Sequence, residues 1–307
     1  MAASRCAICG STGNSTELYP PTFDPDAFTP AVFSARRMPD RVHYRMVRCN
    51  ACGLVRSDPV AAPGFSAQLY RESGFTYGEE TENLARTYGR YLATLADYGV
   101  TKGSLLEIGC GSGFFLEQAA AQGYADARGI EPSRAAVAAA EHHLRARIVC
   151  DVMREGIFPA EEFDAICMFQ VLDHMSDPAA LLEECRRILN PAGLFLCLNH
   201  NASAWSARLL KSRSPIVDIE HTYLFSPATE RRLFTQHGFS VLRTGSVRNT
   251  YTLEYLTRLL PLPGAMKPWA LRILRAVGAG RLRLSLPLGN FYLVAQRTVR
   301  EGKDGES

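Results

Sequence analysis

Three glycines at alternate positions follow an apolar run and could bring bare backbone close to a ligand. Glu107 lies in that run, Gly109, Gly111 and Gly113 follow it, and 114–122 has the composition of a helix. Such a loop lets a ligand approach the backbone and the helix N-terminus. Dinucleotide-binding loops space their glycines Gly-x-Gly-x-x-Gly, so the third glycine here comes one residue early. The Glu107 carboxylate would repel a pyrophosphate but could pair with an amino group, which favours a cofactor that carries an amino acid.

Three further polar side chains follow apolar runs and could bind parts of a nucleoside. Glu131, eighteen residues after Gly113, could accept hydrogen bonds from both hydroxyls of a ribose. Asp151 could accept a hydrogen bond from an adenine amino group, and Gln170 ends the next run. Together with Cys110 inside the glycine loop, these residues are the predicted cofactor contacts.

Four cysteines near the N-terminus form two Cys-x-x-Cys-Gly knuckles. Cys6 and Cys9 make the first knuckle, and Cys49 and Cys52 make the second. A two-residue spacer lets both thiolates of a knuckle face one tetrahedral ion. The pattern predicts a structural zinc site, because four protein ligands leave no open position for a substrate. A redox-active cysteine pair is the alternative.

Three histidines follow the predicted fourth and fifth strands and could act as a general base. They are His174, His200 and His221, and we favour His221 because Glu220 beside it could stabilise a charged imidazole. The alternative role for His221 is a hydrogen bond within the loop before the helix that starts near Ser226. The sequence leaves both roles open.

Strand-like and helix-like segments alternate along the chain, as in parallel sheets that bind ligands at the carboxyl ends of their strands. The predicted helices are 114–122, 133–144 and 177–189. The predicted strands are 105–108, 128–131, 146–150, 163–169, 193–198, 238–242 and 290–295. All the acids and glycines above lie at strand ends, so we expect them to converge on one site.

These motifs make the chain resemble the class I S-adenosylmethionine-dependent methyltransferases, over about residues 85–245 and the last strand. Glu107-x-Gly109-x-Gly111-x-Gly113 is similar to that family's first motif, and Glu131 and Asp151 match its ribose and adenine acids. The resemblance implies a Rossmann-like seven-stranded α/β sheet whose last strand is antiparallel. It also implies methyl transfer by in-line displacement, with S-adenosylhomocysteine as the product.

The segment after the fourth strand also resembles that family. At this place the family usually has Glu-His, and this chain has Asp173-His174.

A narrower resemblance is to the deoxysugar C-methyltransferases, in which a zinc-binding module precedes the cofactor domain. The double knuckle and Glu220-His221-x-x-x-Phe-Ser are similar to that group, which implies proton abstraction by His221. Asp218 stands where those enzymes have a tyrosine, and their large C-terminal domain has no counterpart in these 307 residues. We expect a small-molecule, sugar, sugar-nucleotide or glycolipid acceptor, with carbon and oxygen methylation both open.

The domain prediction is a zinc-ribbon-like module at 1–60, a helical lead-in at 61–100 and a cofactor domain at 101–307. Within the cofactor domain, helices at about 202–215 and 250–285 are expected to roof the acceptor pocket. Residues 250–285 carry six basic residues and one acidic residue, a net charge of +5. Basic amphipathic helices with tryptophan also lie on anionic membranes, so a peripheral membrane contact is the alternative.

Composition limits the function classes. The chain has 307 residues, 47% hydrophobic content and a net charge of +3, which gives no nucleic-acid signature. The N-terminus does not resemble a secretion signal, and no apolar run is long enough to span a membrane, which predicts a cytoplasmic protein. Any membrane contact is expected to be peripheral, at the inner membrane surface. Two other readings remain: a nicotinamide-dependent oxidoreductase, and a non-catalytic cofactor-binding or zinc-mediated interaction module.

Overall fold

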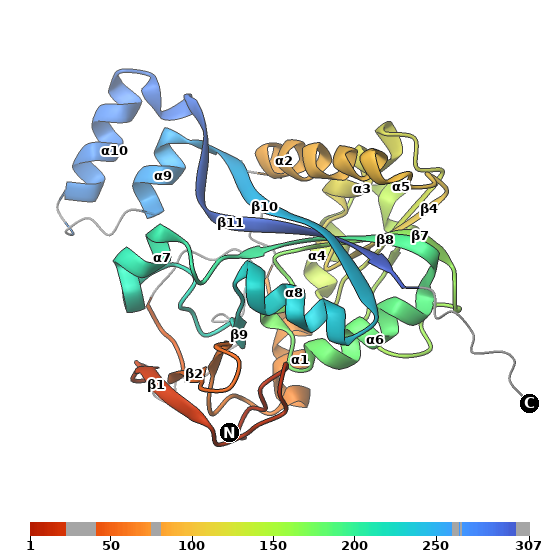
Figure 1. The fold of residues 1–307 in the computed structure, drawn as a ribbon. Helices are drawn as coiled ribbons and strands as arrows, with labels where there is room; N and C mark the ends of the chain where they lie inside the picture. The colour runs from red at the N-terminus through yellow and green to blue at the C-terminus, as the bar shows by residue number, and fades with distance from the viewer. Residues whose placement is uncertain (23–40, 75–80, 260–263, 265, 299–307) are drawn as a thin grey trace, which may run out of the picture.

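The computed structural model describes residues 1–22, 41–74, 81–259, 264 and 266–298, and a mixed sheet forms its centre (Figure 1). In the described residues this sheet has seven strands. In order across the sheet they are β10 (Phe239–Thr252), β11 (Arg283–Arg297), β8 (Leu189–His200), β7 (Phe163–Phe169), β4 (Ser104–Ile108), β5 (Asp126–Ile130) and β6 (Ile148–Val149). Neighbours from β6 to β8 pair in parallel, and β11 is antiparallel to β8 and β10. The predicted seven-stranded α/β fold with an antiparallel last strand is confirmed.

Helices cover both faces of the sheet, so its strands are buried on both sides. In Figure 1, α2 (Thr81–Ala93) and α3 (Phe114–Ala121) lie above the sheet, and α6 (Pro178–Ile188) and α8 (Pro227–Gln236) lie below it. Phe195 packs in the core on the side of Phe234 of α8, whereas its neighbour Leu196 packs in the core that contains Phe115 of α3. This alternation explains why the central strands read as nearly continuous apolar runs.

The predicted helix 177–189 is confirmed as α6, and the predicted helix 133–144 is divided in two. The Asp177 carboxylate accepts a hydrogen bond from the Ala180 N–H and caps α6. The segment 133–144 forms α4 (Arg134–Ala139) and α5 (His142–Arg145). The Arg145 guanidinium donates to the carbonyl oxygens of Ala138 and Ala140, which satisfies carbonyl groups at the end of α4.

The N-terminal module contains a small antiparallel sheet, and one strand of this sheet comes from the large domain. Its own strands are β1 (Ser15–Tyr19), β2 (Met46–Cys49) and β3 (Val55–Ser57). The fourth strand is β9 (Tyr223–Leu224), which pairs with β3. Two helical segments, α1 (Pro63–Glu72) and, after α2, η3 (Thr94–Tyr98), belong to the stretch that precedes β4.

The segment between the last two strands is a helical hairpin on a long β-ribbon. It contains α9 (Leu253–Leu259), α10 (Met266–Ala276) and η6 (Ala279–Arg281). Residues 250–252 and 283–285 belong to β10 and β11, so the prediction of a helical insertion over all of 250–285 is too long at both ends.

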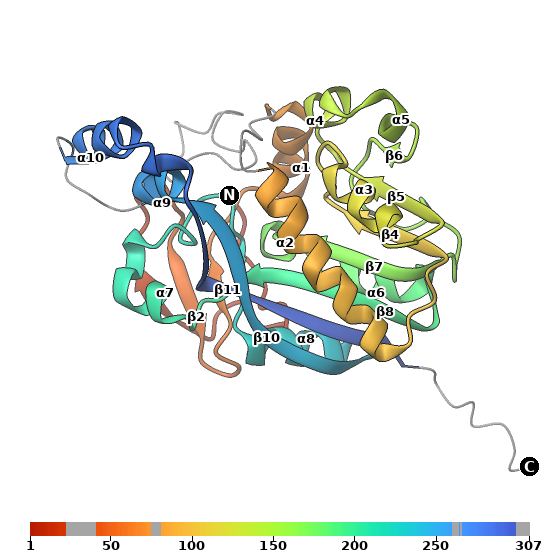
Figure 2. The same ribbon diagram turned by 90° about the horizontal axis from the view of Figure 1, so that it is seen from above.

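Figures 1 and 2 place this hairpin at the same end of the molecule as α7 (Trp205–Leu210). The turn η5 (Lys211–Arg213) follows α7. In the described part of the chain, no helix has the length and apolar character needed to cross a bilayer.

Candidate functional site

The glycine loop at the carboxyl end of β4 has a backbone that favours glycine. Gly109, Gly111 and Gly113 have φ angles of 72°, 56° and 78°, in the left-handed region. A Cβ atom on Gly109 would lie 2.5 Å from Cγ2 of Val171, a residue in the segment that follows β7. The loop therefore lies directly against the segment that leads to Asp173.

Glu131 is fixed beside this loop by two backbone N–H groups. The Gly111 N–H donates to Oε2 over 2.9 Å, and the Ser133 N–H donates to Oε1 over 2.8 Å. Burial raises the pKa of the Glu131 carboxyl, and the two hydrogen bonds oppose that rise. Each carboxylate oxygen has capacity for a further hydrogen bond, so the residue fits two adjacent hydroxyls.

The other predicted cofactor acids have different surroundings. Glu107 is buried. Burial and the charges of Glu107 and Glu131 raise the pKa of the Cys110 thiol, which places both carboxylates around the loop. Burial acts to raise the pKa of Asp151, but hydrogen bonds from the Val152 N–H and from arginines outweigh it and lower that pKa.

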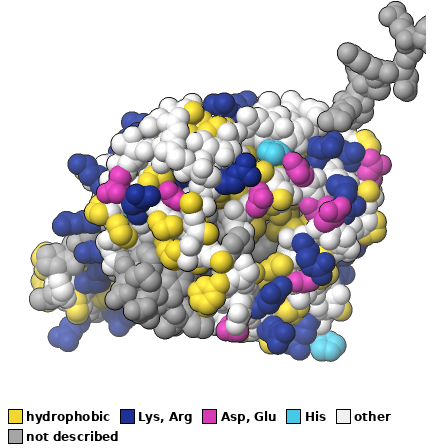
Figure 3. Space-filling model, turned by 90° about the horizontal axis from the view of Figure 1, so that it is seen from below, with side chains coloured by type: hydrophobic (Ala, Val, Ile, Leu, Met, Phe, Trp, Pro, Cys, Tyr) yellow, Lys and Arg dark blue, Asp and Glu magenta, His cyan; other side chains and the backbone are white. Residues whose placement is uncertain are grey.

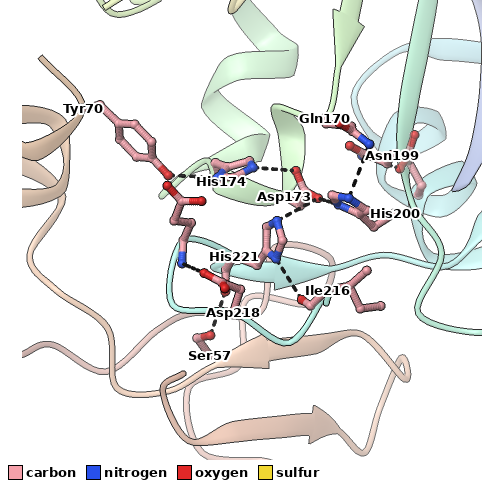
Figure 4. A network of polar contacts seen from close by, with 12 residues as sticks. Ser57, Tyr70, Gln170, Asp173, His174, Asn199, His200, Ile216, Asp218 and His221 are labelled. Carbon is pink, nitrogen blue, oxygen red and sulfur yellow. Dashed lines mark hydrogen bonds and ion pairs between the residues drawn. The ribbon is translucent and has the colours of Figure 1, made fainter. Parts of the chain in front are cut away.

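A cluster of three histidines surrounds the buried carboxylate of Asp173 (Figure 4). The His200 Nδ1–H donates to Asp173 Oδ2 over 2.6 Å. His221 Nε2 lies 3.7 Å from Asp173 Oδ2, and His174 Nε2 lies 3.6 Å from Asp173 Oδ1. The ring centroid of His221 is 4.7 Å from that of His174 and 4.9 Å from that of His200. All three predicted base candidates therefore meet at one carboxylate.

The hydrogen bonds of His221 leave its Nε2 as the basic atom. Its Nδ1–H donates to the Ile216 carbonyl oxygen over 2.8 Å. Burial lowers the pKa of His221, although the charge of Asp173 opposes that effect. Burial would raise the pKa of Asp173, but the three imidazoles outweigh it and hold that pKa well below the usual range. The arrangement is a neutral imidazole beside an ionised carboxylate, which can accept a proton and stabilise the resulting charge.

The same side chains are also close enough to be considered as a metal site. Ligand atoms of Asp173, His200 and His221 lie within 4.8 Å of one another. However, two ligands of one ion lie about 3 Å or more apart when each is about 2.1 Å from the metal. The 2.6 Å separation of Asp173 and His200 is that of a hydrogen bond, so the cluster fits proton transfer better than metal binding.

The outer contacts of the cluster come from distant parts of the chain. The Tyr70 hydroxyl hydrogen-bonds to His174 Nδ1 over 2.9 Å, and the Gln170 side-chain amide lies 3.4 Å from His200 Nε2. The charge of Glu220 contributes to raising the pKa of Tyr70, after the larger effect of burial. The sequence offered several tyrosines before β4 and no pattern that selects Tyr70, because its contact spans 104 residues.

The four knuckle cysteines converge as the spacing predicts. Their sulfur atoms lie within 4.8 Å of one another, with Cys6 and Cys52 3.3 Å apart and Cys9 and Cys49 3.4 Å apart. Two thiolates of a tetrahedral zinc ion lie about 3.8 Å apart, so these side chains fit that ion. Burial would raise the pKa of Cys49, but the N–H groups of Ala51 and Cys52 outweigh it and lower that pKa to about 7.

The N-terminal module contacts the loop that carries His221. The Ser57 hydroxyl donates to the His221 carbonyl oxygen over 2.8 Å, and the Ser57 N–H donates to the Thr222 carbonyl oxygen. The Thr222 N–H in turn donates to the Asp173 carbonyl oxygen. The Tyr223 hydroxyl donates to the carbonyl oxygen of Arg5, next to the first knuckle. The cysteine cluster and the histidine cluster are thus joined by a short chain of hydrogen bonds.

Comparison with known proteins identifies relatives of the large domain. A family model described as a methyltransferase domain matches residues 81–244. The ubiquinone biosynthesis O-methyltransferase of Histophilus somni is 31% identical over 124 residues, which are 36% of this chain and 52% of that protein. The protein of the same name from Bradyrhizobium diazoefficiens is 29% identical over 154 residues, 48% of this chain and 59% of that protein. The chain spans about half the length of the curated relatives that it matches.

Solved structures of similar architecture have low sequence identity. A SAM-dependent methyltransferase from Archaeoglobus fulgidus covers 69% of this chain and 94% of its own, with a TM-score of 0.47 and 16% identity. Another from Aquifex aeolicus covers 78% of this chain and 100% of its own, with a TM-score of 0.46 and 14% identity.

Proposed function

This chain belongs to the methyltransferase domain family, and from that premise we propose that it transfers a methyl group from S-adenosylmethionine to a small-molecule acceptor. The observation that carries the proposal is the close approach of the glycine loop to the segment that leads to the histidine cluster. Gly109 of the cofactor loop lies against Val171, two residues before Asp173, at the carboxyl ends of the neighbouring strands β4 and β7. A cofactor held by the loop would therefore present its reactive end near the histidines.

The cofactor contacts are proposed from the strand ends. Glu107 pairs with the amino group of the cofactor, Glu131 accepts hydrogen bonds from the ribose hydroxyls, and Asp151 accepts one from the adenine amino group. The loop residues Gly109, Cys110, Gly111 and Gly113 line the cofactor with backbone, and Gln170 borders it. The fixed Glu131 carboxylate is the best supported of these contacts, because its orientation is set by two backbone N–H groups.

His221 is the proposed general base, and the charge of Asp173, with a smaller contribution from Asp218, stabilises its charged form. The charge of Glu220 acts instead on Tyr70. S-adenosylmethionine supplies a methyl carbon on a sulfonium, which is already an activated leaving group. His221 Nε2 takes the proton of the acceptor, and the acceptor atom bonds to the methyl carbon as the carbon–sulfur bond breaks with its electron pair on sulfur. The protein aligns the acceptor with the methyl group and excludes water from the buried cluster.

The acceptor class is proposed from the relatives and from the narrower resemblance. The curated relatives are named as O-methyltransferases, which supports an oxygen acceptor. The resemblance of the Glu220-His221 segment supports removal of a proton from a carbon atom of a sugar or glycolipid. In that case the carbon atom accepts the methyl group. A base whose charged form lies beside a carboxylate serves either reaction.

The zinc site is proposed to be structural and the domain boundaries to follow the predicted division. Residues 1–60 form the zinc-ribbon-like module, held by Cys6, Cys9, Cys49 and Cys52. Residues 61–100 lead into the sheet, and 101–307 form the cofactor domain, with 202–215 and 250–285 at its acceptor end. The position of α7 and the hairpin at one end of the molecule supports this division (Figure 2).

Calorimetric titration with S-adenosylhomocysteine and with NAD tests the cofactor directly. We expect saturable one-to-one binding of S-adenosylhomocysteine that NAD does not displace. Binding of NAD in its place would support an oxidoreductase. Binding of S-adenosylhomocysteine without methyl transfer to any acceptor in a cell extract would support a non-catalytic module.

A further inference from the structure

Both tryptophans of the chain are exposed to solvent. The sequence contains two, and the exposed fractions are 63% for Trp205 in α7 and 64% for Trp269 in α10. Tryptophan has a large apolar surface and is highly buried on average in folded proteins. Two exposed tryptophans at one end of the molecule indicate a surface that binds something.

Helix α10 has an apolar face that is largely exposed to solvent. Met266, Trp269, Ile273 and Val277 follow one another at helical spacing, with exposed fractions of 51%, 64%, 40% and 68%. Ala270, Leu271 and Leu274 of α10 are half-buried, and α10 packs against α9. The helix is therefore apolar on two sides, and its hairpin neighbour covers only one of them.

Further exposed apolar side chains belong to α7 and to the start of β11 at the same end of the molecule. Leu282, directly before β11, is 58% exposed, Leu284 in β11 is 41% exposed, and Leu209 in α7 is 72% exposed. The Ser206 hydroxyl donates to the Leu288 carbonyl oxygen over 2.7 Å, which holds α7 against β11. Figures 1 and 2 both show α7 and α10 at this end of the molecule.

Basic residues surround this apolar surface. Residues 250–285 carry a net charge of +5, whereas the whole chain carries +3, so the rest of the chain is net acidic. A shallow hollow along α10 is lined by Gly264, Lys267, Pro268, Leu271, Arg272 and Arg275. Figure 3 shows Lys and Arg side chains projecting at the same end of the molecule. The segment that carries the exposed apolar side chains of α10 therefore has a net positive charge.

We propose that α7, α10 and the first residues of β11 dock on the surface of an anionic phospholipid bilayer. Tryptophan lies at the boundary between headgroups and acyl chains, and an amphipathic basic helix lies in that plane. Each basic residue near an anionic membrane strengthens binding about fivefold. A second copy of the chain is a poorer occupant, because two surfaces of the same positive charge repel each other.

This docking would turn the acceptor end of the sheet towards the bilayer. If the proposed methyl transfer holds, on which this step rests, the acceptor is an amphiphilic molecule that reaches the histidine cluster from the membrane. The docking itself does not depend on catalysis, so the two proposals can fail separately.

The test uses the two tryptophans as reporters in the intact protein. The protein is titrated with vesicles of phosphatidylcholine alone and of phosphatidylcholine with phosphatidylglycerol, and tryptophan emission and co-sedimentation are measured. We expect a blue shift and co-sedimentation with the anionic vesicles only, both reversed by salt. Trp205→Phe and Trp269→Phe then show which tryptophan reports the shift.

Charge reversal with a matched control completes the test. R272E/R281E should weaken binding to anionic vesicles by at least about 25-fold, a factor of about five for each charge removed. R147E/R232E changes the net charge equally at exposed positions elsewhere and should weaken binding much less. S-adenosylhomocysteine binding, measured on the same samples, reports folding and the proposed function independently.

Three results would overturn the proposal. The first is no co-sedimentation with anionic vesicles by protein that binds S-adenosylhomocysteine. The second is equal binding to neutral vesicles. The third is a blue shift that depends on protein concentration without vesicles, which would mean that a second copy covers the surface.

Discussion

Asp173 sets the electrostatics of the site because it is an ionised carboxylate held out of water. Its charge raises the pKa of His221, against the larger lowering effect of burial. The net result is a His221 pKa below its ordinary value, which favours the neutral imidazole. A neutral imidazole whose charged form is stabilised by a nearby anion is suited to accept a proton during a reaction.

The pH dependence of methyl transfer follows from these directions. Because burial lowers the pKa of His221, we expect the acid limb of kcat, where this imidazole becomes protonated, to lie below the ordinary histidine pKa of about 6.5. Asp173→Asn removes the charge that raises the pKa of His221, so the acid limb should move to still lower pH. The same variant should lower kcat about 100-fold, because the charged imidazole loses its anion.

The readout for Asp173→Asn is a pH–rate profile, with calorimetry as the control. S-adenosylhomocysteine affinity should be unchanged, since Asp173 is not a proposed cofactor contact. An acid limb that stays in place would show that His221 is not the group that titrates.

Glu131 is the residue whose loss should affect cofactor binding most. Glu131→Ala removes the acceptor of two proposed hydrogen bonds from the ribose. Together these hydrogen bonds contribute about 3 kcal/mol or more to the binding free energy. Affinity for S-adenosylhomocysteine should therefore fall at least about 100-fold by calorimetry. Glu141→Ala removes an exposed carboxylate elsewhere and should leave affinity unchanged. Unaltered affinity in a folded Glu131→Ala protein would mean that the ribose lies elsewhere.

At the scale of elements, the pairing of β3 with β9 makes the N-terminal module part of the site. The pairing brings Ser57 against the backbone of His221 and Thr222, which lie more than 160 residues away in the sequence. A metal that orders the module would therefore also order the loop that carries His221. Zinc would then act on catalysis through position, without touching the substrate.

Removal of the metal tests this coupling. We expect about one zinc per chain by elemental analysis, lost in Cys9→Ser and kept in Cys150→Ser, which changes a cysteine outside the knuckles. In Cys9→Ser, amide hydrogen exchange of 216–224 should become faster, whereas S-adenosylhomocysteine should still bind. Unchanged exchange in metal-free protein would show that the module does not hold this loop.

At the scale of the whole molecule, the sequence predicted most of the sheet and less of the site. Apolar runs that end in acids or glycines located the strands, because strands covered on both faces leave few positions for polar residues. The predicted bounds of the helical insertion were wrong, because residues 250–252 and 283–285 extend β10 and β11 as a ribbon beyond the sheet. Each of these two segments is a strand because it pairs with the other, and no pattern within either segment predicts that pairing.

The histidine cluster shows the same limit. Each histidine was a candidate by its place after a strand, but their meeting at Asp173 depends on the register of β7 with β8 and on the fold of the loop after α7. Asp173 stood out only as a shorter acid where the resemblance has glutamate. Tyr70 has no signal at all, since an aromatic residue on a helix usually packs in the core.

Methyl transfer by this protein is tested most simply by following label from methyl-labelled S-adenosylmethionine to acceptors in a cell extract. Purified protein, with and without Asp173→Asn, is incubated with the extract, and small-molecule products are separated into organic-soluble and aqueous fractions. We expect a labelled product with the native protein and about 100-fold slower labelling with Asp173→Asn at equal S-adenosylhomocysteine affinity. Equal labelling by both proteins, or no label above the extract alone, would contradict this expectation.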